Sequence, residues 1–178
     1  AKLQAIHKTL YEALPAIHTV LPASDLEPRT WRFTTEAPAD EWMTPAFDDS
    51  AWQTGPAPFG AGSTEGVPRR TPWNTPSIWL RQSFTIADPD VGALHLLLAH
   101  DEDATIYING VEAAAVTGYT TGYVIVPVNE DAARALRAGT NVIAVTCRQT
   151  KGGQAIDVGV IGIRESGAGS RNPAPPAR

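Results

Sequence analysis

The sequence predicts an all-β fold, an antiparallel β-sandwich with an N-terminal helix and one short helical connection. Apolar and polar residues alternate with a period of two from Ser77 to Ile86, as in a strand with one buried face. Asn109 and Gly110 stand between two strand-like runs, and an Asn-Gly pair in that position favours a tight hairpin turn. Other short apolar runs bounded by turn residues bring the total to about seven strands, which is typical of a sandwich.

The first segment has the period of a helix instead. Its apolar residues recur at spacings of three and four, at Leu3, Ile6, Leu10, Leu14 and Ile17. Pro15 is expected to end or kink this helix, and we assign the helix and its linker to residues 1–24. An amphipathic helix of this kind needs a surface that covers its apolar side, either on this domain or on a neighbouring one.

Strands follow in the expected sandwich, residues 25–165. In the run from Ser77 to Ile86, Leu80 and Phe84 share one face, whereas Trp79 and Arg81 share the other. The run "LHLLLAH" is apolar on both faces, as a central strand would be. Further strands are expected in "ATIYINGVEAAAV", "YVIVPV", "NVIAVTCRQ" and "AIDVGVIGI".

A short helix is expected in "NEDAARALRAG", between two of these strands. Asn129 is a candidate N-cap, acidic residues occupy the first turn, and Gly139 follows the last turn as the expected C′ residue. The final segment, residues 166–178, is rich in Pro, Gly and Ala and has no apolar period, so we expect a linker or a disordered tail.

Charge and composition argue against several partners. The net charge is -5 and no cluster of Lys and Arg is present, so neither nucleic acid nor a membrane is an expected partner. The single cysteine, Cys147, cannot form an internal disulfide, and its place in a strand predicts a buried, inert thiol. The four histidines lack metal-ligand spacing, and His95 is expected to lie in the core.

Three consecutive acids, Asp101, Glu102 and Asp103, raise the question of catalysis. Glycoside hydrolysis needs two carboxyl groups that face each other across a substrate, and neighbouring acids on one loop rarely do so. Their spacing also differs from that of an EF-hand loop. Short acids before a strand commonly accept backbone hydrogen bonds in a turn, so a structural corner is expected. Binding of a ligand or of a structural calcium ion is the alternative, and no catalytic residue or other cofactor is expected.

Carbohydrate binding requires aromatic faces for the C–H groups of a sugar and planar polar groups for its hydroxyls. Trp73 lies in the loop "RRTPWNTPS", where flanking turn residues make burial difficult, so Trp73 is the best stacking candidate, with packing under its own loop as the alternative. Core or rim packing is expected instead for three other tryptophans, Trp31, Trp42 and Trp52.

Strand parity adds polar candidates. If the apolar residues of each strand face the core, then Arg81, Arg148 and Asp157 face outward, and "RQTKGGQAID" places polar groups near the acidic loop. The candidate ligand-binding residues are Trp73, Trp79, Arg81, Asp101, Asp103, Tyr119, Arg148, Gln154 and Asp157.

Several motifs together resemble a known family. The segments are "FDDSAWQTGPAPFG", "IWLRQSF", "HDEDATIYINGVEAA", "GYTTGYVIVPV", "LRAGTNVIAV" and "GGQAIDVGV". They are similar to the galactose-binding-domain-like jelly-roll modules of bacterial glycoside hydrolases, in particular the sugar-binding domain of glycoside hydrolase family 2 enzymes. The similarity runs from about Trp31 to Ile163. It implies a module without catalytic residues, in which "DATIYING" is a strand and hairpin of the scaffold.

From the residues and this resemblance we expect a non-catalytic, carbohydrate-binding accessory module of a larger bacterial protein that acts on glycans. That protein is expected to be secreted or periplasmic, and the module's partners to be carbohydrate and the neighbouring domains of the parent chain. The alternative is a structural spacer that packs on a catalytic domain and binds no sugar, which the N-terminal helix favours. An independent hydrolase is the least favoured reading.

Overall fold

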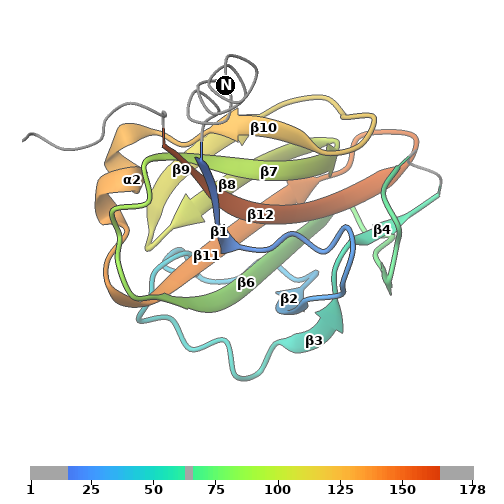
Figure 1. Cartoon of the computed structure of the whole chain (residues 1–178). Coiled ribbons are helices and arrows are strands. Elements are labelled where there is room, and N and C mark those ends of the chain that lie inside the picture. The colour runs from blue at the N-terminus through green and yellow to red at the C-terminus, as the bar shows by residue number, and fades with distance from the viewer. Residues whose placement is uncertain (1–15, 63–65, 165–178) are drawn as a thin grey trace, which may run out of the picture.

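The fold is a sandwich of two six-stranded sheets, seen packed face to face in Figure 1. The computed structural model describes residues 16–62 and 66–164. Sheet A has the order β10-β7-β12-β4-β5, and β1 pairs with β12 beside this path. Sheet B has the order β3-β2-β6-β11-β8-β9. All pairs are antiparallel except β4 with β5, so the predicted fold class is confirmed.

The strands of sheet A are β1 (Ala16–Leu21), β4 (Phe59–Ala61), β5 (Thr71–Pro72), β7 (Ala93–Asp101), β10 (Val124–Pro127) and β12 (Gln154–Arg164). The strands of sheet B are β2 (Thr30–Thr34), β3 (Gln53–Pro56), β6 (Ser77–Ile86), β8 (Asp103–Ile108), β9 (Val111–Val116) and β11 (Gly139–Arg148). The helix is α2 (Glu130–Ala135). The expected strand runs from Ser77 onward all form strands.

The core lies between the sheets and follows the predicted alternation. In the register of β11 with β6, Val145 lies opposite Leu80 and Cys147 opposite Ile78, and all four side chains are buried. Paired residues share a face of a sheet, so period-two apolar residues on both strands face the same core. Cys147 is buried, as predicted, and burial raises the pKa of its thiol to about 12.

The Asn-Gly hairpin is confirmed. Asn109 has φ 51° and Gly110 has φ 88°, the left-handed region that both central positions of a type I′ turn require. The side-chain amide of Asn109 also accepts a hydrogen bond from the Val142 backbone N–H (2.9 Å) and donates one to the Ala135 carbonyl (2.8 Å). Asn109 therefore joins the turn to β11 and to the end of α2.

The short helix forms, but its ends differ from expectation. The Asn129 side chain makes no cap hydrogen bond and instead donates to the Glu112 carbonyl (3.2 Å). The helix ends at Ala135, and Gly139, with φ 88°, begins β11 rather than capping α2. Burial of Ala132 and Leu136 holds this connection against the core, so packing, more than capping, fixes it.

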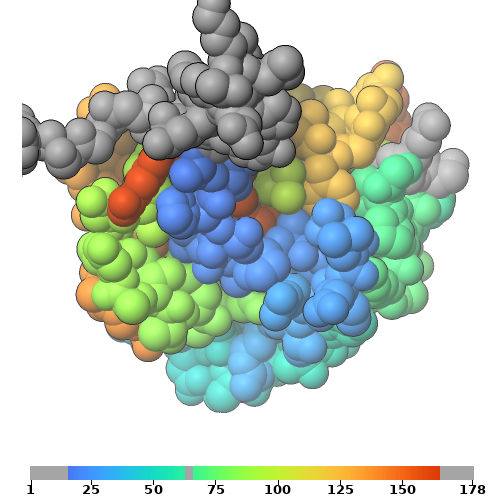
Figure 2. Space-filling model, in the orientation of Figure 1, coloured from blue at the N-terminus to red at the C-terminus, as the bar shows by residue number. Residues whose placement is uncertain are grey.

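The N-terminal part of the described chain belongs to sheet A. Most of the predicted helix lies outside the described residues, but its last apolar position, Ile17, lies in β1 opposite Ile163 of β12. The sandwich therefore includes residues that the sequence assigned to the N-terminal segment. After β1 the chain crosses sheet A (blue in Figure 2), so closely that a Cβ on Gly159 would lie 2.6 Å from the Ala23 nitrogen.

Candidate functional site

The predicted acidic loop lies at one end of the sandwich, where the chain passes from sheet A to sheet B. β7 ends at Asp101 and β8 begins at Asp103, so Glu102 is the single residue between these two strands. Asp101 lies opposite Ala155 of β12 and forms an isolated bridge with Tyr119. We call this region, His100–Asp103 with Tyr119, Arg148 and Gln154, the acidic end.

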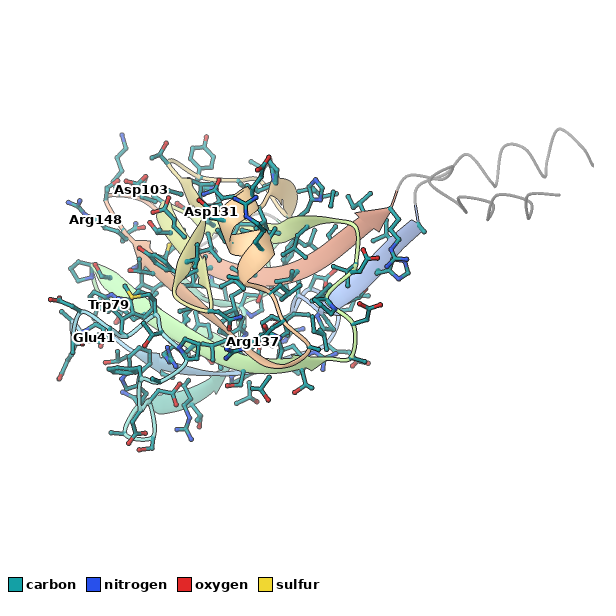
Figure 3. All side chains as sticks on the ribbon, turned by 90° about the vertical axis from the view of Figure 1, so that its left-hand side faces the viewer. Glu41, Trp79, Asp103, Asp131, Arg137 and Arg148 are labelled. Carbon is teal, nitrogen blue, oxygen red and sulfur yellow. The ribbon has the colours of Figure 1, made fainter. Side chains whose placement is uncertain are left out.

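Two of the predicted residues meet across the sheet at the acidic end. Asp103 lies opposite Arg148 in the register of β8 with β11, and Figure 3 shows the two side chains as neighbours. The Asp103 carboxylate accepts a hydrogen bond from the Gly118 backbone N–H (3.0 Å). His100 is buried, with its Nδ1 2.6 Å from the Glu102 carbonyl oxygen. These bonds match the predicted structural corner, in which polar groups hold the turn and the neighbouring loop.

Trp73 does not stack on the surface as proposed, and the alternative, packing under its own loop, is the one that its burial supports. Trp73 is only 2% exposed and belongs to the hydrophobic core, and its Nε1–H donates to the Thr75 hydroxyl (3.1 Å). Trp73 is buried because the pairing of β5 with β4 draws its loop against sheet A. The Trp73 backbone N–H extends this pairing by donating to the Gly60 carbonyl (3.1 Å). Gln154 is buried too and donates to the Thr75 carbonyl (2.8 Å). Both side chains therefore hold a turn.

Arg81 faces away from the core as parity predicted, yet it is buried. Its Nε donates to the Asp49 carboxylate (2.8 Å), and its other nitrogens donate to the carbonyls of Trp42, Thr44 and Phe47. The segment 39–50, which carries these partners, therefore covers the outer face of sheet B at this point. Arg81 binds this segment and has no surface to offer a ligand.

Asp157 also faces outward and is also buried, on the outer face of sheet A. Its carboxylate accepts hydrogen bonds from the Ser24 backbone N–H (2.6 Å) and the Tyr123 hydroxyl (2.8 Å). Burial raises the pKa of Asp157, and the bonds from Tyr123 and Ser24 act in the opposite direction. The segment after β1 covers this residue. Asp157, like Arg81, therefore points away from the core and is still buried.

Among the other candidates, Asp101 is buried, contrary to a role in contacting a ligand, whereas the rest are accessible. Tyr119 is 69% exposed, Arg148 is exposed, and Trp79 and Asp103 are half-buried. Trp79 lies on the outer face of sheet B, opposite Thr146 of β11 and two positions along from Arg148 on the same face (Figure 3). His95 is half-buried rather than in the core, because it lies on the outer face of sheet A, with its Nδ1 3.0 Å from the Ala93 carbonyl oxygen.

A metal centre and a membrane-spanning helix are not found in the described residues. Across residues 16–62 and 66–164, no three His, Cys, Asp or Glu side chains are grouped so that they could hold a metal ion. In the same part of the chain, no helix is long and apolar enough to cross a membrane.

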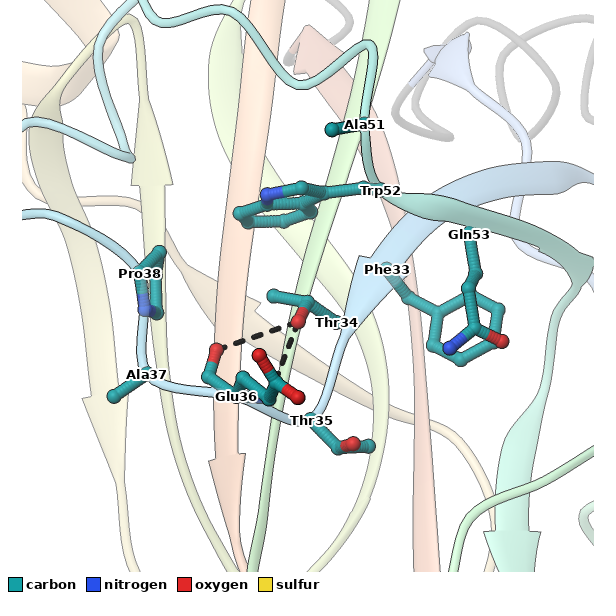
Figure 4. A pocket seen from close by; sticks show the side chains of 9 residues that line it. All are labelled: Phe33, Thr34, Thr35, Glu36, Ala37, Pro38, Ala51, Trp52 and Gln53. Atoms are coloured by element: carbon teal, nitrogen blue, oxygen red, sulfur yellow. Dashed lines mark hydrogen bonds between the residues drawn. The ribbon is translucent and has the colours of Figure 1, made fainter.

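A hollow of about 410 Å³ that the sequence did not predict lies beside the ends of β2 and β3. We call it the Trp52 hollow, and it is lined by Phe33, Thr34, Thr35, Glu36, Ala37, Pro38, Ala51, Trp52 and Gln53 (Figure 4). In Figure 4 the Trp52 indole lies across the hollow, with Thr34 and the Glu36 carboxylate below it and Pro38 at one side. An aromatic ring therefore shares this space with hydroxyl, amide and carboxylate groups.

Packing fixes the orientation of the Trp52 ring. The ring stacks against Trp42 with centroids 6.5 Å apart, and it meets Phe47 edge-on at 5.7 Å. Trp42 is itself held by an edge contact with Tyr107 (5.7 Å) and by the bond from Arg81 to its carbonyl. The indole is therefore set in place before any ligand arrives, which lowers the entropy cost of binding.

The opposite wall of the hollow is formed by a tight turn. The Thr34 hydroxyl accepts a bond from the Glu36 backbone N–H (3.1 Å) and donates to the Glu36 carbonyl (3.3 Å). The exposed Glu36 side chain follows this turn and lines the hollow below Thr34 and the indole (Figure 4). Sequence reasoning assigned Trp52 to scaffold packing and missed this wall, because the pairing of Phe33 with Gln53 that brings the two sides together is long-range.

Comparison with known proteins identifies the fold. No family model and no curated protein matches the sequence. Solved structures do match: a glycosyl hydrolase family 2 member from Bacteroides cellulosilyticus (TM-score 0.57, 20% identity) and a β-glucuronidase from Bacteroides uniformis (TM-score 0.55, 20% identity). A β-glycosidase from Bacteroides vulgatus matches with a TM-score of 0.52 at 16% identity.

The chain shares its fold with one part of these glycosidases. The matches cover 81%, 83% and 82% of this chain but only 20%, 18% and 20% of the three enzymes, in the same order. The chain thus spans about a fifth of the length of the glycosidases that it matches.

Proposed function

We propose that this chain is a non-catalytic carbohydrate-binding accessory module of a larger, secreted or periplasmic protein that acts on glycans. The observation that carries the proposal is the Trp52 hollow, in which a fixed indole lies beside Glu36, Gln53 and Thr35. An aromatic face provides contact for sugar C–H groups, while carboxylate, amide and hydroxyl groups bond sugar hydroxyls. The similarity to part of several glycosidase chains supports the same reading.

The geometry of the predicted ligand residues favours this hollow over the predicted site. Trp73, Arg81, Gln154 and Asp157 are buried and bonded within the protein, so they cannot contact a sugar on the surface. Tyr119 and Arg148 remain accessible, but the residue expected to stack against the ring, Trp73, is buried. The hollow supplies an aromatic ring and polar groups together.

Titration calorimetry of the chain with a panel of soluble oligosaccharides tests the proposal. Trp52→Ala should weaken binding by about 1–3 kcal/mol, the scale of an aromatic contact at a binding hot spot. Gln53→Ala should weaken binding with less effect on packing, because its side chain is exposed. Tyr119→Ala is the matched control, since it removes an exposed aromatic ring at the acidic end and should leave the affinity unchanged.

Two results would contradict this assignment. Loss of binding in Tyr119→Ala with normal binding in Trp52→Ala would place the site at the acidic end. If no oligosaccharide binds the unmodified chain, the carbohydrate-binding function is refuted. As a further check, the chain should hydrolyse no aryl glycoside. Hydrolysis requires a carboxyl acid and a carboxyl base placed around the glycosidic bond, and a non-catalytic module does not supply them.

The second candidate function is a structural spacer, favoured by an apolar surface on the outer face of sheet A. Ile17 and Ile125 are 60% and 54% exposed, and they lie next to the half-buried Ile163 and Leu97 in the strand register. Neighbouring exposed apolar side chains mark surfaces that pack on other domains. On this reading, Ile125→Asp would reduce the activity of the parent enzyme without unfolding the module.

A further inference from the structure

The charges around the Trp52 hollow bear on which class of sugar it takes. Residues 33–52 contain five acidic residues, Glu36, Asp40, Glu41, Asp48 and Asp49, and no Lys, Arg or His. Glu36 is the only ionisable residue that lines the hollow. Among the residues that the structure describes, the Glu36 carboxylate forms no ion pair.

The nearest arginines in the sheet offset only part of this charge. Arg32 and Arg81 lie opposite each other in the register of β2 with β6, and both bind the Asp49 carboxylate, at 3.2 Å and 2.8 Å. Arg32 also donates to the Ser50 carbonyl (3.3 Å). Asp48 stays ionised because a hydrogen bond from the Ser50 backbone N–H lowers its pKa. The surroundings of the hollow are therefore negative at neutral pH.

We infer that the Trp52 hollow binds a sugar that carries a protonated amino group, takes a neutral sugar less tightly, and rejects a uronic acid. The inference rests on the proposed carbohydrate-binding function and adds the sugar class. A ring stacked on the indole places its substituents near Glu36, which attracts an ammonium group and repels a carboxylate. A neutral sugar bonds Glu36 through a hydroxyl without the ionic contribution.

The inference is tested with three oligomers of equal length, made of glucosamine, N-acetylglucosamine or glucuronic acid. Calorimetry at mildly acidic pH keeps the amino sugar protonated. The glucosamine oligomer should bind about two- to fivefold more tightly than the N-acetylated one, the range that an exposed ion pair provides. The glucuronic acid oligomer should bind least, and added salt should reduce the difference between the first two.

A matched pair of substitutions locates the effect. Glu36→Gln keeps the shape of the side chain and should abolish the preference for glucosamine. Glu41→Gln removes an acid of the same segment that does not line the hollow, and should preserve the preference. If the glucuronic acid oligomer binds as tightly as the others, or if Glu36→Gln leaves the preference intact, this inference is wrong while the proposed function stands. If none of the three oligomers, and nothing in the wider panel, binds, the proposed function itself fails.

Discussion

Arg81 and Arg32 share one carboxylate, and replacing each with Met should affect stability very differently. Both bind Asp49, but the Arg81 side chain is 3% exposed whereas that of Arg32 is 40% exposed. Arg81→Met removes the ion pair and leaves the carbonyls of Trp42 and Phe47 without the donor that Arg81 supplies. Breaking a buried charged network costs about 3–5 kcal/mol, whereas an exposed pair contributes less than about 1 kcal/mol.

Urea unfolding followed by tryptophan fluorescence measures this difference. With an m-value of roughly 2 kcal/mol per molar urea, Arg81→Met should lower the midpoint by about 1.5–2.5 M, and Arg32→Met by less than about 0.5 M. Arg81→Lys, which keeps the charge but loses the planar fork, should fall between them and serves if the Met variant does not fold. Equal shifts for the two Met variants would refute the idea that burial of the Arg81 network holds segment 39–50 in place.

Two further predictions concern the core. Trp73→Ala should lower the free energy of unfolding by about 3–5 kcal/mol in thermal or urea melts, because the side chain fills the core and bonds the Thr75 hydroxyl; a change below about 1 kcal/mol would contradict its burial. Cys147 should not react with a thiol reagent in the native state, because burial raises the pKa of the thiol to about 12. An unfolded thiol titrates near pH 9, so stability should decline as the pH rises above that value, and Cys147→Ala should lack this part of the decline; identical pH profiles would argue against the raised pKa.

Local patterns in the sequence predicted the elements of the fold well. The alternation from Ser77 to Ile86 and the Asn109-Gly110 turn are set by neighbouring residues, and both appear in the structure as expected. Cys147 was placed in the core by the same alternation. The sequence therefore predicts those features that are determined by residues within the same strand or turn.

Exposure could not be predicted in the same way, because it depends on segments distant in the sequence. Parity correctly turned Arg81 and Asp157 away from the core, but segment 39–50 covers the first, and Ser24 with Tyr123 covers the second. Only the tertiary structure shows that these outer faces are covered. The Trp52 hollow was missed for a related reason, although the run of acids without a basic residue around Trp52 was visible in the sequence.

The position of β12 in sheet A has a consequence for how the protein is made. β12 is the last strand of the described residues, yet it lies inside the sheet, with β7 on one side and β1 and β4 on the other. During translation, β1 must wait until the sequence through Arg164 has been made, on the order of ten seconds later at ordinary elongation rates, before its partner is complete. Until then, the edges of β1, β4 and β7 that pair with β12 are open to other chains. A recombinant version that stops before Gln154, and so lacks β12, would keep those edges permanently open, and it should aggregate rather than fold.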